Sequence, residues 1–332
     1  MRKIDRKLSF LKLMAFVASV VFGFIGMVGS AIADDWPTKD ITLIVPHAPG
    51  GGYDVLARTA APFIEKHLPK KANVIVKNVI GAGGRIGLME TLKAKPDGHT
   101  IGIDDPLNVT ITQIGGQLKG VDVLKISWLG RLDNLPYLLM VGIKSGFKSP
   151  ADMRDKPVRF AVGDTSQALS TAVVAKVLGT ESRIITYEGT GPANFAILQG
   201  DIDAFMVNWP SAMRMVRASE AKLIPLFVCE KVPELKEIPS AKDLGISFEK
   251  LALPLLRYSH VLYASPGLPP ELKKMWDEIL NKVFIDPEWL ARMNKIGIPP
   301  SGLTGGKLSA IVTETFETTE KFKDILASLG TK

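Results

Sequence analysis

The feature that most constrains the fold is a unit that recurs along the chain: an apolar run rich in β-branched residues, a glycine-rich loop and a helical stretch. In the first half, the apolar runs occupy residues 40–45, 73–77 and 99–103, and glycine loops at 50–54 and 81–84 follow the first two. Such runs favour buried strands, and strands that alternate with helices predict a parallel sheet wound by helices. We therefore expect an α/β fold built from doubly wound sheets.

The same unit continues in the second half. We expect strands at residues 137–143, 158–162, 183–187, 202–207 and 257–264, the last of which returns to the first domain. The loops at 163–166 and 189–191 precede helices; Gly179 ends the first of these helices, and Pro192 takes the first position of the second. Two further helices, at 271–284 and 308–329, close the chain. A chain of 332 residues corresponds to about two domains, and because no low-complexity linker divides it, we expect crossing strands to join them.

Residues 1–33 have the pattern of a signal peptide. Basic residues up to Lys12 precede an apolar run at 13–28, and the small residues Ala31 and Ala33 fit cleavage by signal peptidase after Ala33. The run is shorter than the roughly 20 apolar residues of a membrane span, although an uncleaved anchor is the alternative. We expect an exported, soluble protein of the periplasm.

Charge and cysteine content exclude other classes of protein. Residues 1–33 carry a net charge of +4, so only +3 of the chain's +7 belongs to residues 34–332. That balance, without a stripe of Lys and Arg, argues against nucleic-acid binding. The single cysteine, Cys229, cannot form an internal disulfide, and we expect a buried thiol.

The sequence carries no motif typical of catalysis, a cofactor or a metal. The first glycine loop lacks the third glycine of the dinucleotide fingerprint, and the second strand ends in Lys77-Asn78 instead of an acid. Gly305-Gly306-Lys307 lacks the spacing of a phosphate-binding loop, the four histidines lack metal-ligand spacing, and no Gly-x-Ser-x-Gly turn occurs. We expect no cofactor and no enzymatic activity, and a periplasmic enzyme is the least favoured alternative.

The four glycine loops share a property that suits an anion. In a parallel sheet, the loops that follow the strands and the starts of the next helices lie along one edge, where ligands bind. A helix start carries about half a positive charge and unpaired N–H groups, so it can bind a carboxylate without Lys or Arg. The alternative is that the loops are only tight turns and helix caps.

An ordered set of motifs resembles one known family. The set comprises Trp36-Pro37, Pro49-Gly50-Gly51-Gly52 with Asp54, Gly81-Ala82-Gly83-Gly84, Pro96-Asp97-Gly98-His99-Thr100, Tyr187 with Gly189 and Pro192-Ala193, Gly200 with Asp203, and Ser265-Pro266-Gly267-Leu268-Pro269. These motifs cover residues 36–270 in order. On them, the chain resembles the periplasmic solute receptors of tripartite tricarboxylate transporters, the Bug family.

The resemblance implies a two-domain periplasmic binding protein-like (type II) fold, with the ligand cleft between two doubly wound α/β domains. We place domain 1 at 34–140 plus 255–332 and domain 2 at 141–254, with the crossings near 138–144 and 254–262. Family members bind small carboxylates in the cleft, close around them and deliver them to a membrane permease.

By position, the resemblance also implies ligand contacts from both domains. Those of the first domain are Gly51, Gly52, Tyr53, Asp54, Ala82 and Gly83, and those of the second are Thr165, Ser166, Thr190, Asn208 and Trp209. We expect Asp54 to cap its helix, because a carboxylate would repel an anionic ligand. Tyr53 and Trp209 are expected to add an aromatic wall, with packing in the domain core as the alternative for Trp209.

The chain departs from the family pattern at informative positions. Tyr53 replaces a usual Thr, Gln167-Ala168 replaces the usual Ser-His after Thr165-Ser166, Glu188 replaces a usual Lys, and Asn208 stands where an acid is common. Loss of that acid favours a carboxylate ligand with an apolar or aromatic body and no amine. The expected partners are this small carboxylate and integral membrane transporter subunits, with a membrane sensor kinase as the alternative, and we expect a monomer.

Overall fold

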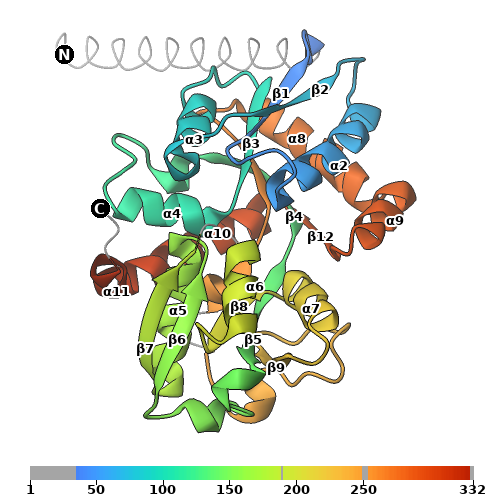
Figure 1. Cartoon of the computed structure of the whole chain (residues 1–332). Helices are drawn as coiled ribbons and strands as arrows, with labels where there is room; N and C mark the ends of the chain where they lie inside the picture. The colour runs from blue at the N-terminus through green and yellow to red at the C-terminus, as the bar shows by residue number, and fades with distance from the viewer. Residues whose placement is uncertain (1–34, 188–189, 249–252, 330–332) are drawn as a thin grey trace, which may run out of the picture.

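The computed structural model describes residues 35–187, 190–248 and 253–329, which form two lobes, each built on its own sheet (Figure 1). The predicted signal peptide and its cleavage site lie outside the described residues, as do Glu188 and Gly189. None of the described helices is long and apolar enough to cross a membrane.

The first lobe contains a six-stranded sheet in the order β12-β4-β11-β3-β1-β2. Its strands are β1 (Ile41–Val45), β2 (Val74–Asn78), β3 (Thr100–Asp104), β4 (Ser127–Asp133), β11 (Val261–Ala264) and β12 (Pro300–Thr304). β1 pairs in parallel with β2 and β3, whereas β11 and β12 pair antiparallel with their neighbours. The parallel half of the sheet therefore comes from the predicted repeating unit, and the antiparallel half combines β4 with β11 and β12, which come from later in the chain.

Helices cover both faces of this sheet. They are α2 (Gly52–His67), α3 (Arg85–Leu92), α4 (Pro106–Ile114), α8 (Pro270–Ile285), α9 (Pro287–Lys295) and α10 (Gly305–Lys321). Successive β11 residues enter opposite cores, because side chains alternate along a strand: Leu262 packs with α2 and α8, and Tyr263 packs with α3 and α10.

The second lobe contains a sheet in the order β10-β5-β8-β6-β7, with β9 also paired to β5. Its strands are β5 (Leu135–Gly142), β6 (Pro157–Val162), β7 (Glu181–Thr186), β8 (Ala204–Asn208), β9 (Leu223–Val228) and β10 (Arg257–Tyr258). Its helices are α5 (Thr165–Leu178), α6 (Thr190–Gln199) and α7 (Trp209–Ala218). Pro192 is the third residue of α6 and not the first, whereas Gly179 ends α5 in the left-handed conformation that glycine favours.

Short 3₁₀ helices complete the described secondary structure. They are η1 (Ala82–Gly84), η2 (Val123–Lys125), η3 (Ile143–Ser145), η4 (Pro150–Met153), η5 (Lys242–Leu244) and η6 (Leu253–Leu256).

The chain passes between the sheets at two neighbouring points. β4 ends in the first sheet at Asp133 and β5 begins in the second at Leu135, so the first crossing lies at Asn134, earlier than the expected 138–144. The expected single strand at 257–264 is two strands, β10 in the second sheet and β11 in the first. The second crossing therefore lies at Ser259-His260, inside the expected range of 254–262.

The lobes also contact each other through helices. The expected helix at 308–329 is interrupted at Phe322, which separates α10 from α11 (Lys323–Ser328). Leu326 of α11, together with Leu107 of α4, is buried in the same apolar cluster as α5 of the second lobe. The C-terminal helix consequently packs against the second lobe, although α10 packs on the first.

Candidate functional site

A polar cavity of about 430 Å³ lies between the lobes. From the first lobe it is lined by η1 and by residues on α3 and α4, and from the second by the start of α5 and the end of β7. The lining residues are Ala82, Gly83, Arg85, Asn108, Ile111, Thr112, Gln117, Thr165, Thr186 and Leu329. Three of the residues predicted from sequence, Ala82, Gly83 and Thr165, are thus brought together from the two lobes.

The first-lobe side of the cavity has an unusual backbone. Gly81, Ala82, Gly83 and Gly84 all have positive φ, at 134°, 50°, 67° and 93°. Three of the four residues are glycines, which reach such values without strain, and the N–H groups of Gly84 and Ile86 bond to the Gly81 carbonyl within the loop. The loop borders the cavity at Ala82 and Gly83 and leads directly into the first turn of α3.

The second-lobe side is the start of α5, which Asp164 caps. One Asp164 carboxylate oxygen accepts from the Gln167 N–H at 2.8 Å and from the Ser166 hydroxyl at 3.0 Å. The Gln167 amide donates in turn to the Met206 carbonyl at 2.6 Å, which ties α5 to β8. Ser166 is buried and its hydroxyl is engaged by Asp164, so Thr165 is the residue of the predicted pair that lines the cavity.

The first glycine loop does not line this cavity. Tyr53 is buried, and its ring stacks on His47 with the centroids 4.1 Å apart. Asp54 does not cap α2 by bonding to the helix N–H groups: its oxygens accept from the Gly50 N–H at 2.9 Å and from Arg58 and Asn78 at 3.0 and 2.9 Å. Burial raises the pKa of Asp54, but these three donors outweigh it and hold the pKa below its ordinary value. Asp54 therefore stabilises the loop that contains Gly51 and Gly52.

Asn208 and Trp209 also lie outside the described lining of the cavity. Asn208 caps α7, because its side-chain oxygen accepts from the Ser211 N–H at 3.1 Å. Trp209 is half-buried against the apolar core of the second lobe, which is the alternative considered for it above. Thr190 is the first residue of α6. Neither Tyr53 nor Trp209 forms the expected aromatic wall of this cavity.

Arg85 is a lining residue that the sequence analysis missed. It follows the second glycine loop directly, is half-buried, and donates to the Gln117 side-chain oxygen at 2.5 Å. The sequence did contain one indication that Arg85 could line the site, because Arg85 comes immediately after a loop predicted to bind an anion. Its partner Gln117 lies 32 positions away, so the contact itself depends on the tertiary fold.

Residues 56–330 match the family model described as Tripartite tricarboxylate transporter family receptor, or TctC. This chain belongs to the TctC receptor family. Among its relatives is Protein BugT of Bordetella pertussis, which is 28% identical over 242 residues, covering 69% of this chain and 73% of BugT.

Solved structures share the fold of this TctC receptor. A TctC solute-binding protein from Polaromonas, without ligand, matches with a TM-score of 0.72 at 23% identity, over 88% of this chain and 99% of the other. A protein of R. palustris with adipate matches with a TM-score of 0.69 at 22% identity, over 88% of this chain and 99% of the other. The predicted family and its two-domain α/β binding-protein fold are therefore confirmed.

Buried ionisable groups surround the two crossings of the receptor. His260 donates its backbone N–H to Asp133 at 2.9 Å, and its Nδ1 lies 2.7 Å from the other Asp133 oxygen. Asp105 accepts from the Leu107 N–H at 2.9 Å and from the Ser259 N–H at 3.2 Å. These two carboxylates hold both crossing segments to each other and to α4.

Electrostatics at the crossings are dominated by burial. Burial raises the pKa of Asp104 and that of Asp105, the latter to about 7. Burial lowers the pKa of His47, although Asp104 and Asp164 act against it. Because Asp164 belongs to α5, its interaction with His47 places the loop after β1 close to the start of that helix.

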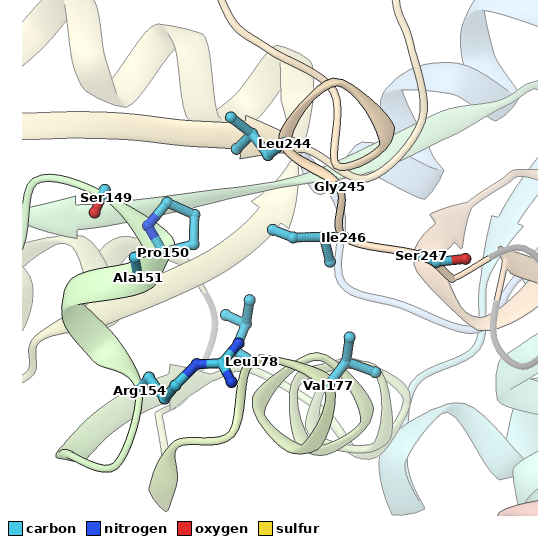
Figure 2. Close-up of a pocket in the computed structure, with 10 residues that line it drawn as sticks. All are labelled: Ser149, Pro150, Ala151, Arg154, Val177, Leu178, Leu244, Gly245, Ile246 and Ser247. Atoms are coloured by element: carbon cyan, nitrogen blue, oxygen red, sulfur yellow. The ribbon is translucent and has the colours of Figure 1, made fainter.

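A second cavity, of about 450 Å³, lies within the second lobe (Figure 2). It borders η4, η5 and the end of α5 opposite to Thr165, and most of its labelled side chains are apolar, with Arg154 as the charged group. A helix of 14 residues is about 21 Å long, so this cavity is remote from the interlobe site. None of the predicted ligand contacts lines it.

Two observations concern metal binding and the single cysteine in the part of the chain that the structure describes. No group of three or more His, Cys, Asp or Glu side chains among them is placed to hold a metal ion. Cys229 is buried, as expected, and burial raises the pKa of its thiol, which stays protonated and unreactive. The TctC family is one of solute receptors.

Proposed function

We propose that this protein captures a small carboxylate in the interlobe cavity, in the periplasm, and delivers it to a tripartite tricarboxylate-type membrane transporter. One observation carries the proposal: the glycine loop at η1 and the start of α5, both predicted from sequence to contact the ligand, border one polar cavity from opposite lobes. The membership of the TctC family and the fold neighbour with adipate support a carboxylate ligand and a transporter partner.

Capture works by stabilising the closed arrangement of the lobes. A ligand that contacts both Ala82 and Thr165 bridges the two lobes, and it favours closure only as far as it binds the closed form better than the open form. The crossings at Asn134 and at Ser259-His260 provide the two chain segments about which such receptors hinge. The closed surface is then available to the transporter.

Binding is expected to raise the stability of the purified exported protein. A carboxylate present at a hundred times its dissociation constant adds about 2.7 kcal/mol to the free energy of unfolding. We expect Thr165→Ala to weaken binding several-fold, because Thr165 lines the cavity at the start of α5. Thermal unfolding with mono-, di- and tricarboxylates measures both effects.

The matched control is Thr180→Ala, at the other end of α5, where the hydroxyl donates only to the Ala175 carbonyl. This variant should bind as the wild type does. Equal loss of affinity in the two variants, or no stabilisation by any carboxylate, would contradict the proposed site.

A transporter and a membrane sensor kinase would recognise the same ligand-bound form of the protein. Binding experiments therefore cannot distinguish the two roles, but an experiment in cells can. Deletion of the gene is expected to abolish uptake of the carboxylate identified by the binding screen, measured with radiolabelled ligand. If uptake persists while transcriptional induction by that carboxylate is lost, the protein serves a sensor and the transport proposal fails.

A further inference from the structure

A single side-chain cation borders the interlobe cavity among the described lining residues. Arg85 lies in the first turn of α3, and Nη1 donates to Oε1 of Gln117, which also lines the cavity. Arg85 forms no ion pair with any described carboxylate, whereas Arg58, also in the first lobe, is paired with Asp54 at 3.0 Å. A neutral amide orients the guanidinium of Arg85 without neutralising it, so its charge is available to a ligand.

A guanidinium suits a carboxylate in particular. Its planar fork of N–H groups matches the two carboxylate oxygens, and the charge-assisted bonds are about twice as strong as neutral ones. The glycine loop that precedes Arg85 borders the same cavity at Ala82 and Gly83, whereas the N–H groups of Gly84, Arg85 and Ile86 bond to carbonyl oxygens within the loop. The first lobe therefore provides one guanidinium beside the loop, which suits one carboxylate.

Apart from Arg85, the lining side chains that the structure describes are neutral and mostly polar. They include Asn108, Thr112, Gln117, Thr165 and Thr186, with Ile111 and Leu329 as apolar members. Hydroxyl and amide side chains both donate and accept, as the hydroxyl groups of a ligand do. They provide no second cation for a second carboxylate.

The second lobe adds a reason against a second anionic group. Asp164 caps α5 directly before Thr165, and its side chain is exposed. Its negative charge offsets part of the positive end of the α5 dipole, so the start of α5 suits a neutral hydroxyl group of the ligand at Thr165 better than a second carboxylate. The volume of about 430 Å³ falls in the range of about 300 to 1,000 Å³ typical of small-molecule sites.

We propose that the ligand is a hydroxylated monocarboxylate of the sugar-acid type, whose carboxylate pairs with Arg85 and whose hydroxyl groups bond the neutral polar side chains. The inference rests on the proposed function, because it concerns the same cavity. It replaces the expectation of an apolar or aromatic ligand body, since the aromatic residues behind that expectation, Tyr53 and Trp209, do not line the cavity.

The test compares acids of equal length by isothermal titration calorimetry. The six-carbon set is gluconate, hexanoate and adipate, and the four-carbon set is threonate, butyrate and succinate. In at least one set, the hydroxylated acid should bind at least tenfold more tightly than the other two, because a site built to bond hydroxyl groups rejects analogues that lack them. Arg85→Gln should weaken that binding at least tenfold, and Arg85→Lys should restore part of it.

Arg154→Gln is the matched control, because it removes the same charge from the cavity of the second lobe. It should bind the hydroxylated acid within twofold of the wild type. Denaturant unfolding of each variant verifies that it is folded. If Arg85→Gln does not fold, the binding of the wild-type ligand series and of Arg85→Lys still tests the proposal.

The outcomes separate the two proposals. Tighter binding of adipate or succinate, or unchanged binding in folded Arg85→Gln, overturns the inference about the ligand and leaves carboxylate capture standing. Failure of every acid in both sets to bind overturns the inference, and if tricarboxylates fail as well, it overturns the proposed function.

Discussion

Replacing Asp133 with alanine is expected to lower the free energy of unfolding by about 3 to 5 kcal/mol. Asp133 is fully buried at the end of β4, and its two oxygens accept from the backbone N–H and from the ring of His260. The alanine variant leaves both donors in the interior without an acceptor, which is the costly way to break a buried pair. Urea denaturation followed by circular dichroism measures the change.

The control for this variant is Glu278→Ala. Glu278 lies 4.0 Å from Lys274 on an exposed face of α8, and such surface pairs contribute at most about 1 kcal/mol. A loss below about 1 kcal/mol in Asp133→Ala as well would show that the crossings are not held together by this pair.

The second large effect concerns Asp105 and pH. Burial raises the pKa of Asp105 to about 7 in the folded protein, about three units above its ordinary value, and each unit corresponds to about 1.4 kcal/mol. The folded state therefore retains a proton that the unfolded state has released between about pH 4 and pH 7. In this window the contribution of Asp105 to stability falls as pH rises, by a total on the order of 4 kcal/mol.

Comparison with Asp105→Asn isolates this contribution. Asparagine is neutral at every pH and keeps an oxygen that can accept from the Leu107 N–H. The stability of the wild type minus that of the variant should fall between pH 4.5 and pH 7.5. The lowered pKa of His47 has the opposite effect on stability, but His47 is present in both proteins and its contribution largely cancels.

Asp40→Asn provides a control of opposite sign. The Asn73 backbone and side-chain N–H groups lower the pKa of Asp40, so the stability of wild type minus that of this variant should rise with pH below about pH 4 and stay level between pH 4.5 and pH 7.5. A difference between wild type and Asp105→Asn that stays constant with pH would contradict the raised pKa of Asp105.

Local chemistry made much of the fold predictable. The run at 40–45 is β-branched and apolar because β1 is buried, and Gly179 stands where α5 must end in a left-handed turn. The glycine loop at 81–84 was recognised for the same reason, since its run of positive φ values favours glycine. Signals of this kind act within a few residues of chain.

Features that depend on distant partners could not be predicted in this way. The strand at 257–264 divides because Arg257 pairs with Pro136 in one sheet and Val261 pairs with Asp104 in the other. Tyr53 is buried because His260, more than 200 positions away, packs edge-on against it. The guanidinium of Arg85 is held at the cavity by Gln117, and nothing near Arg85 in the sequence reveals that contact.

The position of α11 gives the end of the chain an influence on how far the cleft can open. Its Leu326 is seated among apolar side chains of the second lobe, and Leu329, at its end, borders the cavity. The packing of α11 therefore adds a third connection between the lobes, beside the two crossings of the chain. In the closure proposed above, a wide opening would have to separate α11 from this apolar cluster, so we expect deletion of α11 to change how far the lobes open.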